Sequence, residues 1–483
     1  MNTTVKQIGT TTTECQLTDC HSGLERCDGE LFQANCAGDL QRLMAHAARS
    51  GQKVITHGGR HAMGGQQMQD RALLVSLKNM NRLLALDSRR GLATFQGGAT
   101  FKEVIESLAR EQSEKEANNI WCIRQKPTGV DDVSLGGAIA SNIHGRALNL
   151  APLAGDIEKL AVVTAGGDIL TLSERENQDL FRRVVGGFGL FGMVESVTLR
   201  LKRRQVLERQ VQMVAVEDLL TVLQKRVQEG AQYGDFQFAI DHEQEGFLTR
   251  GIASTYHPVQ VDADAMPELT RNQSALSPQM WRKLICLAHT NKSEAFRIYS
   301  EHYQRTNGQL YLSDRMQLST YFDGYHKEME SHNHGSEIIT ELYVPRNFLT
   351  VFMHRAAALL RKRRADVIYG TVRMIEKDTV AALPWASDNF ACIVLNLHTE
   401  HDREALRHTG ETFQELIDLA LALKGNFYLT YHKFARPEQL LRGYPALPEC
   451  LQAKLAYDPQ ERFHSNFYQY LKLSLETFRQ TEH

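Results

Sequence analysis

Four glycine-rich stretches in the first 200 residues constrain this chain more than any other feature of its sequence. They are GGRHAMGGQ (58–66), GGAT (97–100), PTGVDDVSLGGAIASNIHG (127–145) and GGFGLFG (186–192). Because glycine has no Cβ and tolerates positive φ, such backbone can approach a ligand closely and turn its N–H groups toward phosphates. Four such stretches in one part of the chain predict a long ligand that lies across several loops.

The segments between these stretches predict a mixed lobe of short strands and helices. We expect helices at 39–51, with Asp39 as the N-cap, and at 100–111, which opens with the capping-box pattern T-x-x-E. KVITH (53–57) is a short strand that runs into the first glycine stretch, and LAVVTAGGDILTL (160–172) predicts a hairpin around its GGD turn.

After residue 204 the pattern changes to longer helices and longer strands. The expected helices are 217–230, 347–364 and 403–425, and the expected strands are 235–240, 337–344, 367–375 and 390–398. This is typical of an antiparallel sheet backed by helices. The predicted fold is α+β with two lobes: a ligand-binding domain at 1–204, whose residues 1–30 form an arm, a cap or substrate domain at 205–425, and a segment at 426–483 that returns to the first lobe.

One motif suggests a nicotinamide cofactor but lies in the wrong context. GFGLFG (187–192) matches G-x-G-x-x-G, which binds a dinucleotide when a strand precedes it and a helix follows. Here a helix at 178–185 precedes the glycines and an alternating strand at 193–202 follows them. We therefore expect either a simple glycine-rich turn or a stretch of backbone that contacts a different ligand. A nicotinamide-dependent dehydrogenase is the least favoured alternative.

The charge balance and the cysteines exclude several other classes. With 55 basic and 57 acidic residues the net charge is −2, so no nucleic-acid partner is expected. No stretch approaches 18 apolar residues and the N-terminus lacks an apolar core, so neither a membrane span nor a secretory signal is expected. The eight cysteines fit no zinc spacing and read as reduced thiols of a cytoplasmic protein, and HNH (332–334) reads as a loop, so no metal is expected.

Taken in order, the motifs resemble those of a known family. GGRHAMGGQ, GGAT, SLGGAIASNIHG and GGFGLFGMV, then TELYVPR (340–346) and YDPQERF (457–463), resemble the vanillyl-alcohol oxidase / p-cresol methylhydroxylase superfamily. Within it, the sequence is most similar to the sugar-alcohol and aldonolactone oxidases and to decaprenylphosphoryl-ribose oxidase. The resemblance implies a p-cresol methylhydroxylase-type FAD-binding domain followed by a cap domain, and FAD suits the long ligand that the glycine stretches predict.

The resemblance gives the histidine of the first glycine stretch a role. Many members carry a histidine there, in a G-x-H-[SA] setting, that is covalently joined to the flavin, and the matching residue is His61 rather than His57. A neutral imidazole can attack the electrophilic methyl position of the flavin. The alternative is a histidine that only hydrogen-bonds within its turn, and decaprenylphosphoryl-ribose oxidases lack the residue. PTGVDDVSLGG has no cysteine, so a second covalent link is not expected.

The resemblance also implies cofactor contacts from every glycine stretch. They are Gly58, Gly59, Arg60, Ala62, Gly64, Gly65, Gln66, Gly98, Pro127, Thr128, Gly129, Ser134, Gly136, Gly137, Ala138, Ser141, Asn142, Gly189, Gly192 and Val194.

Three residues are candidates for the base that takes the substrate's hydroxyl proton while the flavin takes hydride at N5. The segment YLTYHKFARPEQLLRGYP (428–445) resembles the one that carries an active-site lysine in the decaprenylphosphoryl-ribose branch, and Lys433 corresponds best. The spacing differs by about two residues, which leaves His432 in contention; on an alternating strand only one of the two reaches the flavin. His144 matches a position that is often a histidine near the working face of the flavin, where the alternative is a structural hydrogen bond.

The cap strands supply the candidate substrate contacts Glu341, Tyr343 and Arg373. Glu341 and Tyr343 are two residues apart and therefore share one face of a strand, which suits a polyol or a sugar. The alternative is a strand whose polar face is exposed to solvent.

The leading hypothesis is an FAD-dependent oxidoreductase that oxidises a hydroxyl-bearing carbon of a sugar, polyol, lactone or similar polar alcohol. Oxygen or another acceptor would reoxidise the flavin. An alternative keeps the fold but oxidises a glycosyl lipid or natural-product intermediate as half of an epimerisation, which a paired reductase encoded nearby would favour. A third possibility is a flavin-binding partner subunit without catalytic activity, for which no alcohol would reduce the flavin.

Overall fold

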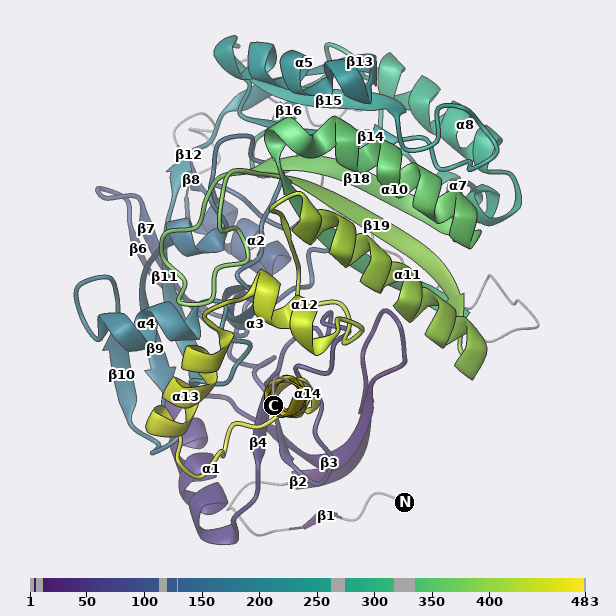
Figure 1. Ribbon diagram of the computed structural model, residues 1–483. Helices are drawn as coiled ribbons and strands as arrows, with labels where there is room; N and C mark the ends of the chain where they lie inside the picture. The colour runs from purple at the N-terminus through teal and green to yellow at the C-terminus, as the bar shows by residue number, and fades with distance from the viewer. Residues whose placement is uncertain are drawn as a thin grey trace.

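The computed structural model describes residues 4–5, 12–112, 120–127, 129–261, 274–316 and 335–481. Thr128 and the HNH motif at 332–334 lie outside these ranges. The first lobe and the cap are stacked on each other, and the C-terminal helices lie in front of the first lobe, below the cap (Figure 1). The α+β class predicted from the sequence is confirmed.

The first sheet of the first lobe combines residues of the predicted N-terminal arm with the strands around the first glycine stretch. Its order is β1 (Thr4–Val5), β2 (Thr12–Thr18), β3 (Arg26–Gln33), β5 (Leu73–Ser76) and β4 (Val54–His57), and β5 pairs in parallel with both β3 and β4. Within the predicted arm, residues 12–18 and 26–30 are thus strand residues of this sheet. Both strands of this hairpin are polar and half-buried, so they lack the hydrophobic alternation that marks a strand in a sequence.

The second sheet of the first lobe is antiparallel throughout. Its order is β10 (Ile169–Leu172), β9 (Ile157–Val163), β11 (Met193–Arg200), β7 (Leu92–Gln96) and β6 (Leu83–Asp87). The predicted hairpin around the GGD turn is confirmed as β9 and β10. A short ribbon of β8 (Trp121–Cys122) and β12 (Lys202–Arg203) lies beside it.

Within its described residues, this lobe also contains four helices and one 3-10 turn: α1 (Ala37–Ser50), α2 (Phe101–Glu111), α3 (Leu135–Ser141), α4 (Gln178–Val184) and η2 (Leu153–Asp156). The capping box of α2 is confirmed, because Thr100 and Glu103 bond each other's backbone N–H groups. Helix α1 begins earlier than predicted, with Cys36 at the N-cap. Asp39 instead lies in its first turn, where its carboxylate accepts from the backbone N–H of Asn35 and pairs with Arg42.

The cap contains the predicted antiparallel sheet, which is larger than expected. Its eight strands run in the order β16 (Leu310–Leu312), β13 (Val206–Ala215), β15 (Arg250–Val259), β14 (Tyr233–Phe238), β18 (Val367–Ile375), β19 (Phe390–Glu400), β17 (Gly335–Pro345) and β20 (Asn426–Phe427). Its helices are α5 (Val216–Gln228), α7 (Pro278–Thr290), α8 (Lys292–Arg305), α10 (Leu349–Arg363) and α11 (Arg403–Ala422), with the short turn η4 (Arg346–Phe348) before α10. The strands β13 and β15 and the pair α7–α8 were not predicted.

The two faces of the cap sheet have different neighbours. Helices α10 and α11 lie against one face (Figure 1), where β17 places Ile338, Leu342 and Val344, all buried. The alternating residues of β17 point to the opposite face. That face is turned toward the first lobe and toward α7, whose His289 reaches Glu337 of β17.

The C-terminal segment contains α12 (Pro437–Gly443), α13 (Leu447–Tyr457) and α14 (Asn466–Thr481) and contacts the first lobe. The backbone N–H of Val54 donates to the carbonyl of Arg462 at 2.7 Å, and the ring of Phe467 lies 4.9 Å from that of Phe188. Residues 428–434 were expected to form a strand, but they form turns. These turns let the carbonyl of Thr430 accept from the N–H groups of the first glycine stretch.

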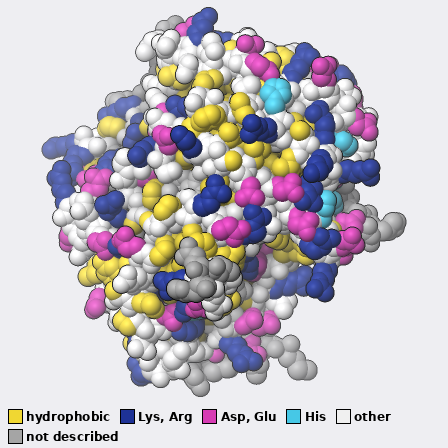
Figure 2. Space-filling model, viewed as in Figure 1, with side chains coloured by type: hydrophobic (Ala, Val, Ile, Leu, Met, Phe, Trp, Pro, Cys, Tyr) yellow, Lys and Arg dark blue, Asp and Glu magenta, His cyan; other side chains and the backbone are white. Residues whose placement is uncertain are grey.

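Basic and acidic side chains are interspersed over the visible face of the molecule, in keeping with the balanced composition (Figure 2). Across the described ranges, no helix has both the length and the apolar character that crossing a membrane requires.

Candidate functional site

All four glycine stretches meet around the short helix α3. The N–H of Gly136 donates to the carbonyl of Gly97 at 2.7 Å, and the N–H of Phe188 donates to the carbonyl of Ala140 at 2.8 Å. A Cβ on Gly58 would lie 2.0 Å from Oγ of Ser134, the N-cap of α3. The predicted cofactor residues are therefore brought together from four distant parts of the sequence.

The shape and the donors of this region fit FAD. Gly58, Gly129 and Gly137 are exposed, so their backbone is open to a ligand, whereas Gly98 is buried and a Cβ there would lie 1.8 Å from a carbonyl oxygen. Some glycines thus let the loops pack on one another while others leave bare backbone at the surface, as a pyrophosphate requires. The Nε2 atom of His57 is also buried without a hydrogen-bond partner in the described part of the chain.

Two of the predicted cofactor contacts use their side-chain amides within the protein. Asn142, which lies at the C-cap of α3, donates from Nδ2 to Asp378 at 2.8 Å and accepts from the N–H of Ala154 at 2.9 Å. Gln66 donates to the carbonyl of Leu429 at 2.9 Å. Both amides hold the first lobe against the cap or the C-terminal segment.

His61 lies against two residues that sequence reasoning missed. Its Nδ1 is 3.0 Å from Nε2 of His21 and 3.3 Å from Sγ of Cys20. Both neighbours lie in the turn between β2 and β3, where the carboxylate of Asp19 accepts from the N–H groups of Ser22 and other turn residues. A partner at Nδ1 decides which imidazole nitrogen keeps its lone pair, so this turn sets the chemistry of His61. The sequence DCHSG (19–23), which is typical of a turn and contains both residues, was the only sign of this contact in the sequence.

A buried polar cluster joins the first lobe, the cap and the C-terminal segment; we call it the Glu341 cluster. Oε2 of Glu341 accepts from the hydroxyl of Tyr343 at 2.8 Å and lies 2.9 Å from Nε2 of His144, and Oε1 accepts from the hydroxyl of Tyr431 at 3.2 Å. Sγ of Cys392 is 3.8 Å from both the carboxylate and the imidazole. The side chains of His144 and Glu341 are each only 4% exposed, so this face of β17 does not face solvent.

The strand register explains how the cap contributes to this cluster. Tyr343 of β17 lies directly opposite Cys392 of β19, which lies directly opposite Arg373 of β18. Paired residues in an antiparallel sheet point to the same face, so Arg373 joins Glu341 there. The structure thus brings together four of the six predicted catalytic residues: His144, Glu341, Tyr343 and Arg373.

The electrostatics of the cluster hold one negative charge in place. Burial opposes ionisation of Glu341, but His144, Arg373 and the Tyr343 hydroxyl outweigh it and hold the pKa of the carboxyl below its usual value. Burial, reinforced by this carboxylate, raises the pKa values of Tyr343 and Cys392 well above their usual range. At neutral pH the cluster therefore contains a carboxylate surrounded by protonated donors.

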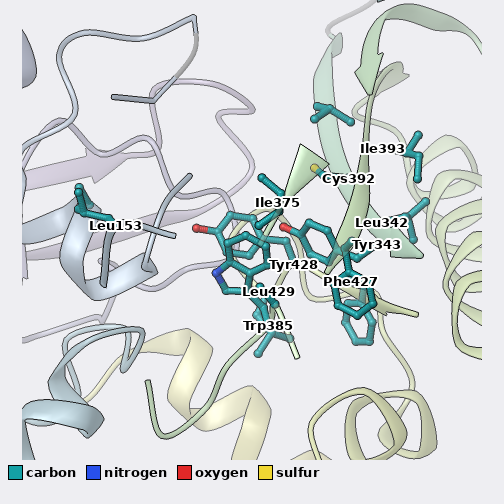
Figure 3. Close-up of a cluster of buried hydrophobic side chains, with 14 of the residues drawn as sticks. Leu153, Leu342, Tyr343, Ile375, Trp385, Cys392, Ile393, Phe427, Tyr428 and Leu429 are labelled. Carbon is teal, nitrogen blue, oxygen red and sulfur yellow. The ribbon is translucent and has the colours of Figure 1, made fainter. Parts of the chain in front are cut away.

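Aromatic rings form a wall beside the cluster. Tyr343 stacks on Trp385 at 4.6 Å, and Figure 3 shows both rings beside Tyr428. The indole N–H of Trp385 donates to the carbonyl of Asn142, and the hydroxyl of Tyr428 donates to the carbonyl of Ser141. The wall therefore seats the cap and the C-terminal segment on α3. Sequence reasoning missed Trp385, whose only signal was a tryptophan in a loop.

The same face of the cap sheet carries further buried polar groups beyond the cluster. Gln237 donates to the hydroxyl of Tyr369 at 3.2 Å and to Asp235 at 3.1 Å, and Arg146 of the first lobe lies 3.5 Å from the same aspartate. Five buried polar atoms on this face have no hydrogen-bond partner among the residues that the structure describes: Arg146 Nε, Asp235 Oδ1, Gln237 Oε1, Arg373 Nε and Asn396 Oδ1. Buried polar groups are normally satisfied, so this face suits a ligand with several hydroxyl groups.

His432 and Lys433 are not part of this cluster. Nε2 of His432 lies 3.1 Å from the hydroxyl of Thr340, and its ring packs against Phe413 of α11, on the opposite face of β17. Lys433 forms an ion pair with Glu25 and lines a surface groove beside α12 and α14. As the sequence predicted, the adjacent side chains of His432 and Lys433 point to different surroundings. They do so because this segment turns, and not because it is a strand with alternating faces.

The buried position of His432 predicts a pH-dependent stability. Burial lowers the pKa of its imidazole to about 3, below the ordinary 6.5. Its contribution is therefore fully present above pH 6.5 and is lost as the pH falls toward 3, because protonation favours the unfolded chain. Between pH 7.5 and 5.5 this one group should lower the free energy of unfolding by about 1.4 kcal/mol.

Urea unfolding of the wild type and of His432→Leu at both pH values measures this term. The variant should be less stable at pH 7.5, and its deficit should shrink by that amount at pH 5.5. Parallel pH dependences would show that His432 is not held neutral by burial.

Comparisons with known proteins connect this geometry to a family. The profile of the FAD binding domain family matches residues 31–173. The chain is 30% identical over 162 residues to L-gulono-1,4-lactone dehydrogenase of Mycobacterium tuberculosis. The aligned residues make up 34% of this chain and 35% of that protein. It is 26% identical over 175 residues to L-gulonolactone oxidase of Mus musculus, covering 36% and 38% of the two chains.

A third relative extends the same pattern. A protein named putative D-arabinono-1,4-lactone oxidase, from Neurospora crassa, is 24% identical over 172 residues, or 35% of this chain and 29% of that protein. The chain thus matches only about a third of the length of each of these relatives. Residues 31–173, which contain three of the four glycine stretches, therefore form an FAD-binding domain of the p-cresol methylhydroxylase type.

Proposed function

We propose that this protein is an FAD-dependent oxidoreductase that oxidises a hydroxyl-bearing carbon of a sugar, a polyol or an aldonolactone. The Glu341 cluster is the observation that carries the proposal. It places a buried carboxylate, an imidazole and two tyrosine hydroxyls where the FAD-binding domain, the cap sheet and the C-terminal segment meet. Ligand sites with a few convergent polar groups are typical of such junctions.

The polar face of the cap sheet supports a substrate with several hydroxyl groups. Arg146, Gln237, Arg373 and Asn396 each present a buried polar atom to this face. The three relatives described above are named for the 1,4-lactones of gulonic and arabinonic acid, or for gulonolactone. Such lactones carry a hydroxyl group on most carbons, so both observations favour the same substrate class.

The residues of the Glu341 cluster can each take a separate role in the oxidation of an alcohol. FAD, when bound, accepts the hydride from the substrate carbon. Nδ1 of His144 lies 3.3 Å from the carbonyl of Gly145, which can only accept a hydrogen bond, so His144 must turn away from this carbonyl to act as a base. When Nε2 donates to Glu341 and this contact is broken, Nδ1 can accept the hydroxyl proton, and the fixed carboxylate stabilises the imidazolium that results. Arg373 would bind a neighbouring oxygen of the substrate, and the aromatic wall would exclude water. This assigns the base to His144 rather than to Lys433 or His432.

We also propose that His61 attaches the cofactor covalently. It lies in the first glycine stretch, within hydrogen-bond distance of His21 and Cys20, which can hold its proton on Nδ1. Nε2 would then be the nucleophilic nitrogen. The glycines Gly58, Gly59, Gly136 and Gly137 would face the pyrophosphate.

The proposed substrate class is tested by mixing the purified protein with candidate alcohols under anaerobic conditions. Aldonolactones, polyols and aldoses should be compared, each at millimolar concentration, and at least one should bleach the flavin absorption band within seconds to minutes. An alcohol without further hydroxyl groups, such as 1-butanol, should leave the band unchanged, as should addition of NAD. If no polar alcohol bleaches the flavin, the proposed reaction is wrong and a non-catalytic flavin-binding subunit is favoured.

A further inference from the structure

A second cluster of potential ligands lies at the far end of the cap sheet. It consists of His289 in the last turn of α7, Glu337 in β17 and His398 in β19. Nε2 of His289 and Nδ1 of His398 each lie 3.3 Å from Oε1 of Glu337, and the three ligand atoms are all within 4.8 Å of one another. The three side chains are only 11 to 23% exposed.

The fold builds this cluster from three distant segments. Glu337 and His398 are directly paired across β17 and β19 and therefore point to the same face. The junction between α7 and α8 is anchored to the same end of the sheet, because Lys292 donates to the carbonyl of Val367 at 2.7 Å and pairs with Asp366. A Cβ on Gly335 would lie 2.9 Å from the ring of His398, so a glycine here leaves room for the imidazole.

We propose that His289, Glu337 and His398 bind a divalent transition-metal ion, with Zn²⁺ as the best match. Zinc binds imidazole nitrogen and carboxylate oxygen at about 2.0 to 2.2 Å, so two ligand atoms of a tetrahedral site lie roughly 3.3 to 3.6 Å apart. Both nitrogen-to-oxygen distances in this cluster are 3.3 Å. Two imidazoles and one carboxylate suit zinc, whereas calcium and magnesium prefer oxygen ligands alone.

The position of the cluster indicates what the ion would do. Glu337 is four residues from Glu341 on the same face of β17, which places the metal about 13 Å from the Glu341 cluster along the strand. The ion would therefore not take part in the oxidation. It would fasten the end of α7 to β17 and β19 and so hold the α7–α8 pair on the face that also carries the polar groups of the substrate side. This proposal is independent of the proposed function.

Titration of the full-length protein with Zn²⁺ tests the site directly. After treatment with EDTA and dialysis, calorimetry should show one zinc ion bound per chain with micromolar or tighter affinity. Co²⁺ should give the intense visible absorption of a tetrahedral complex, and Zn²⁺ should abolish it. A wild-type protein that binds no zinc at 100 µM, or that binds Co²⁺ only as an octahedral complex, would overturn the proposal.

Matched variants separate this cluster from the other histidines. His398→Ala should lose the high-affinity zinc ion, and Glu337→Gln, which retains a hydrogen-bonding side chain and guards against a folding defect, should weaken it at least tenfold. His354→Ala removes a histidine from an exposed pair with Glu217 and should bind zinc like the wild type. Zinc should raise the melting temperature of wild type and His354→Ala but not of His398→Ala. Equal zinc affinity in all four proteins would rule the site out.

Discussion

Replacement of His61 by alanine should move the flavin from the acid precipitate into the supernatant. In the wild type, precipitation with trichloroacetic acid should leave nearly all the flavin in the protein pellet, because a carbon–nitrogen bond survives denaturation. The alanine variant lacks the nucleophilic nitrogen, so any FAD it binds is held by the glycine stretches alone and is released when the chain unfolds. Absorbance of the two fractions near 450 nm measures the change.

His57→Ala is the matched control for that experiment. His57 ends β4 only four residues before His61, and both side chains are partly buried. Its variant should keep the flavin in the pellet. If instead His57→Ala releases the flavin and His61→Ala retains it, the proposed attachment residue is wrong. If the wild type itself releases its FAD, the protein binds the cofactor without a covalent link.

Replacement of Glu341 by glutamine should produce the largest loss of catalytic activity. The neutral amide preserves the shape of the side chain but removes the charge that would stabilise a protonated His144. We expect kcat/KM to fall about 10² to 10³-fold, or about 3 to 4 kcal/mol of transition-state stabilisation. The flavin content should remain normal, because Glu341 belongs to the cap and not to the glycine stretches. The rate of anaerobic flavin reduction by the best substrate measures the effect without interference from reoxidation.

Lys433→Met is the control that decides between the two candidate sites. Lys433 is the base that family resemblance favours, but in this structure it pairs with Glu25 at a surface groove. Its replacement should leave kcat/KM within a few-fold of the wild type. A large loss in Lys433→Met together with a small loss in Glu341→Gln would move the active site to the groove beside α12 and α14 and contradict the assignment made here.

Local patterns in the sequence predicted the elements whose stability depends on their own residues. The capping box at Thr100 and Glu103 and the hairpin around the GGD turn are satisfied within a few residues, and both are confirmed. The alternation of β17 correctly placed Glu341 and Tyr343 on one face. The strands β2, β3 and β13 escaped prediction because their polar, partly buried side chains show no clear period of two, and β15 because nearly all of its residues are buried and so do not alternate.

By itself, the amino-acid sequence determined where the glycine-rich backbone lies, and from it we predicted a long ligand, since no other residue allows such close approach. It also determined which polar residues the cap strands would offer. Only the tertiary structure decided which of the candidate site residues contact one another. Turns at 428–434 send His432 and Lys433 to different surroundings, and the β2–β3 turn carries His21 and Cys20 to His61. The reason is physical: a site assembled from segments hundreds of residues apart depends on strand register and packing, and neither is encoded in any local pattern.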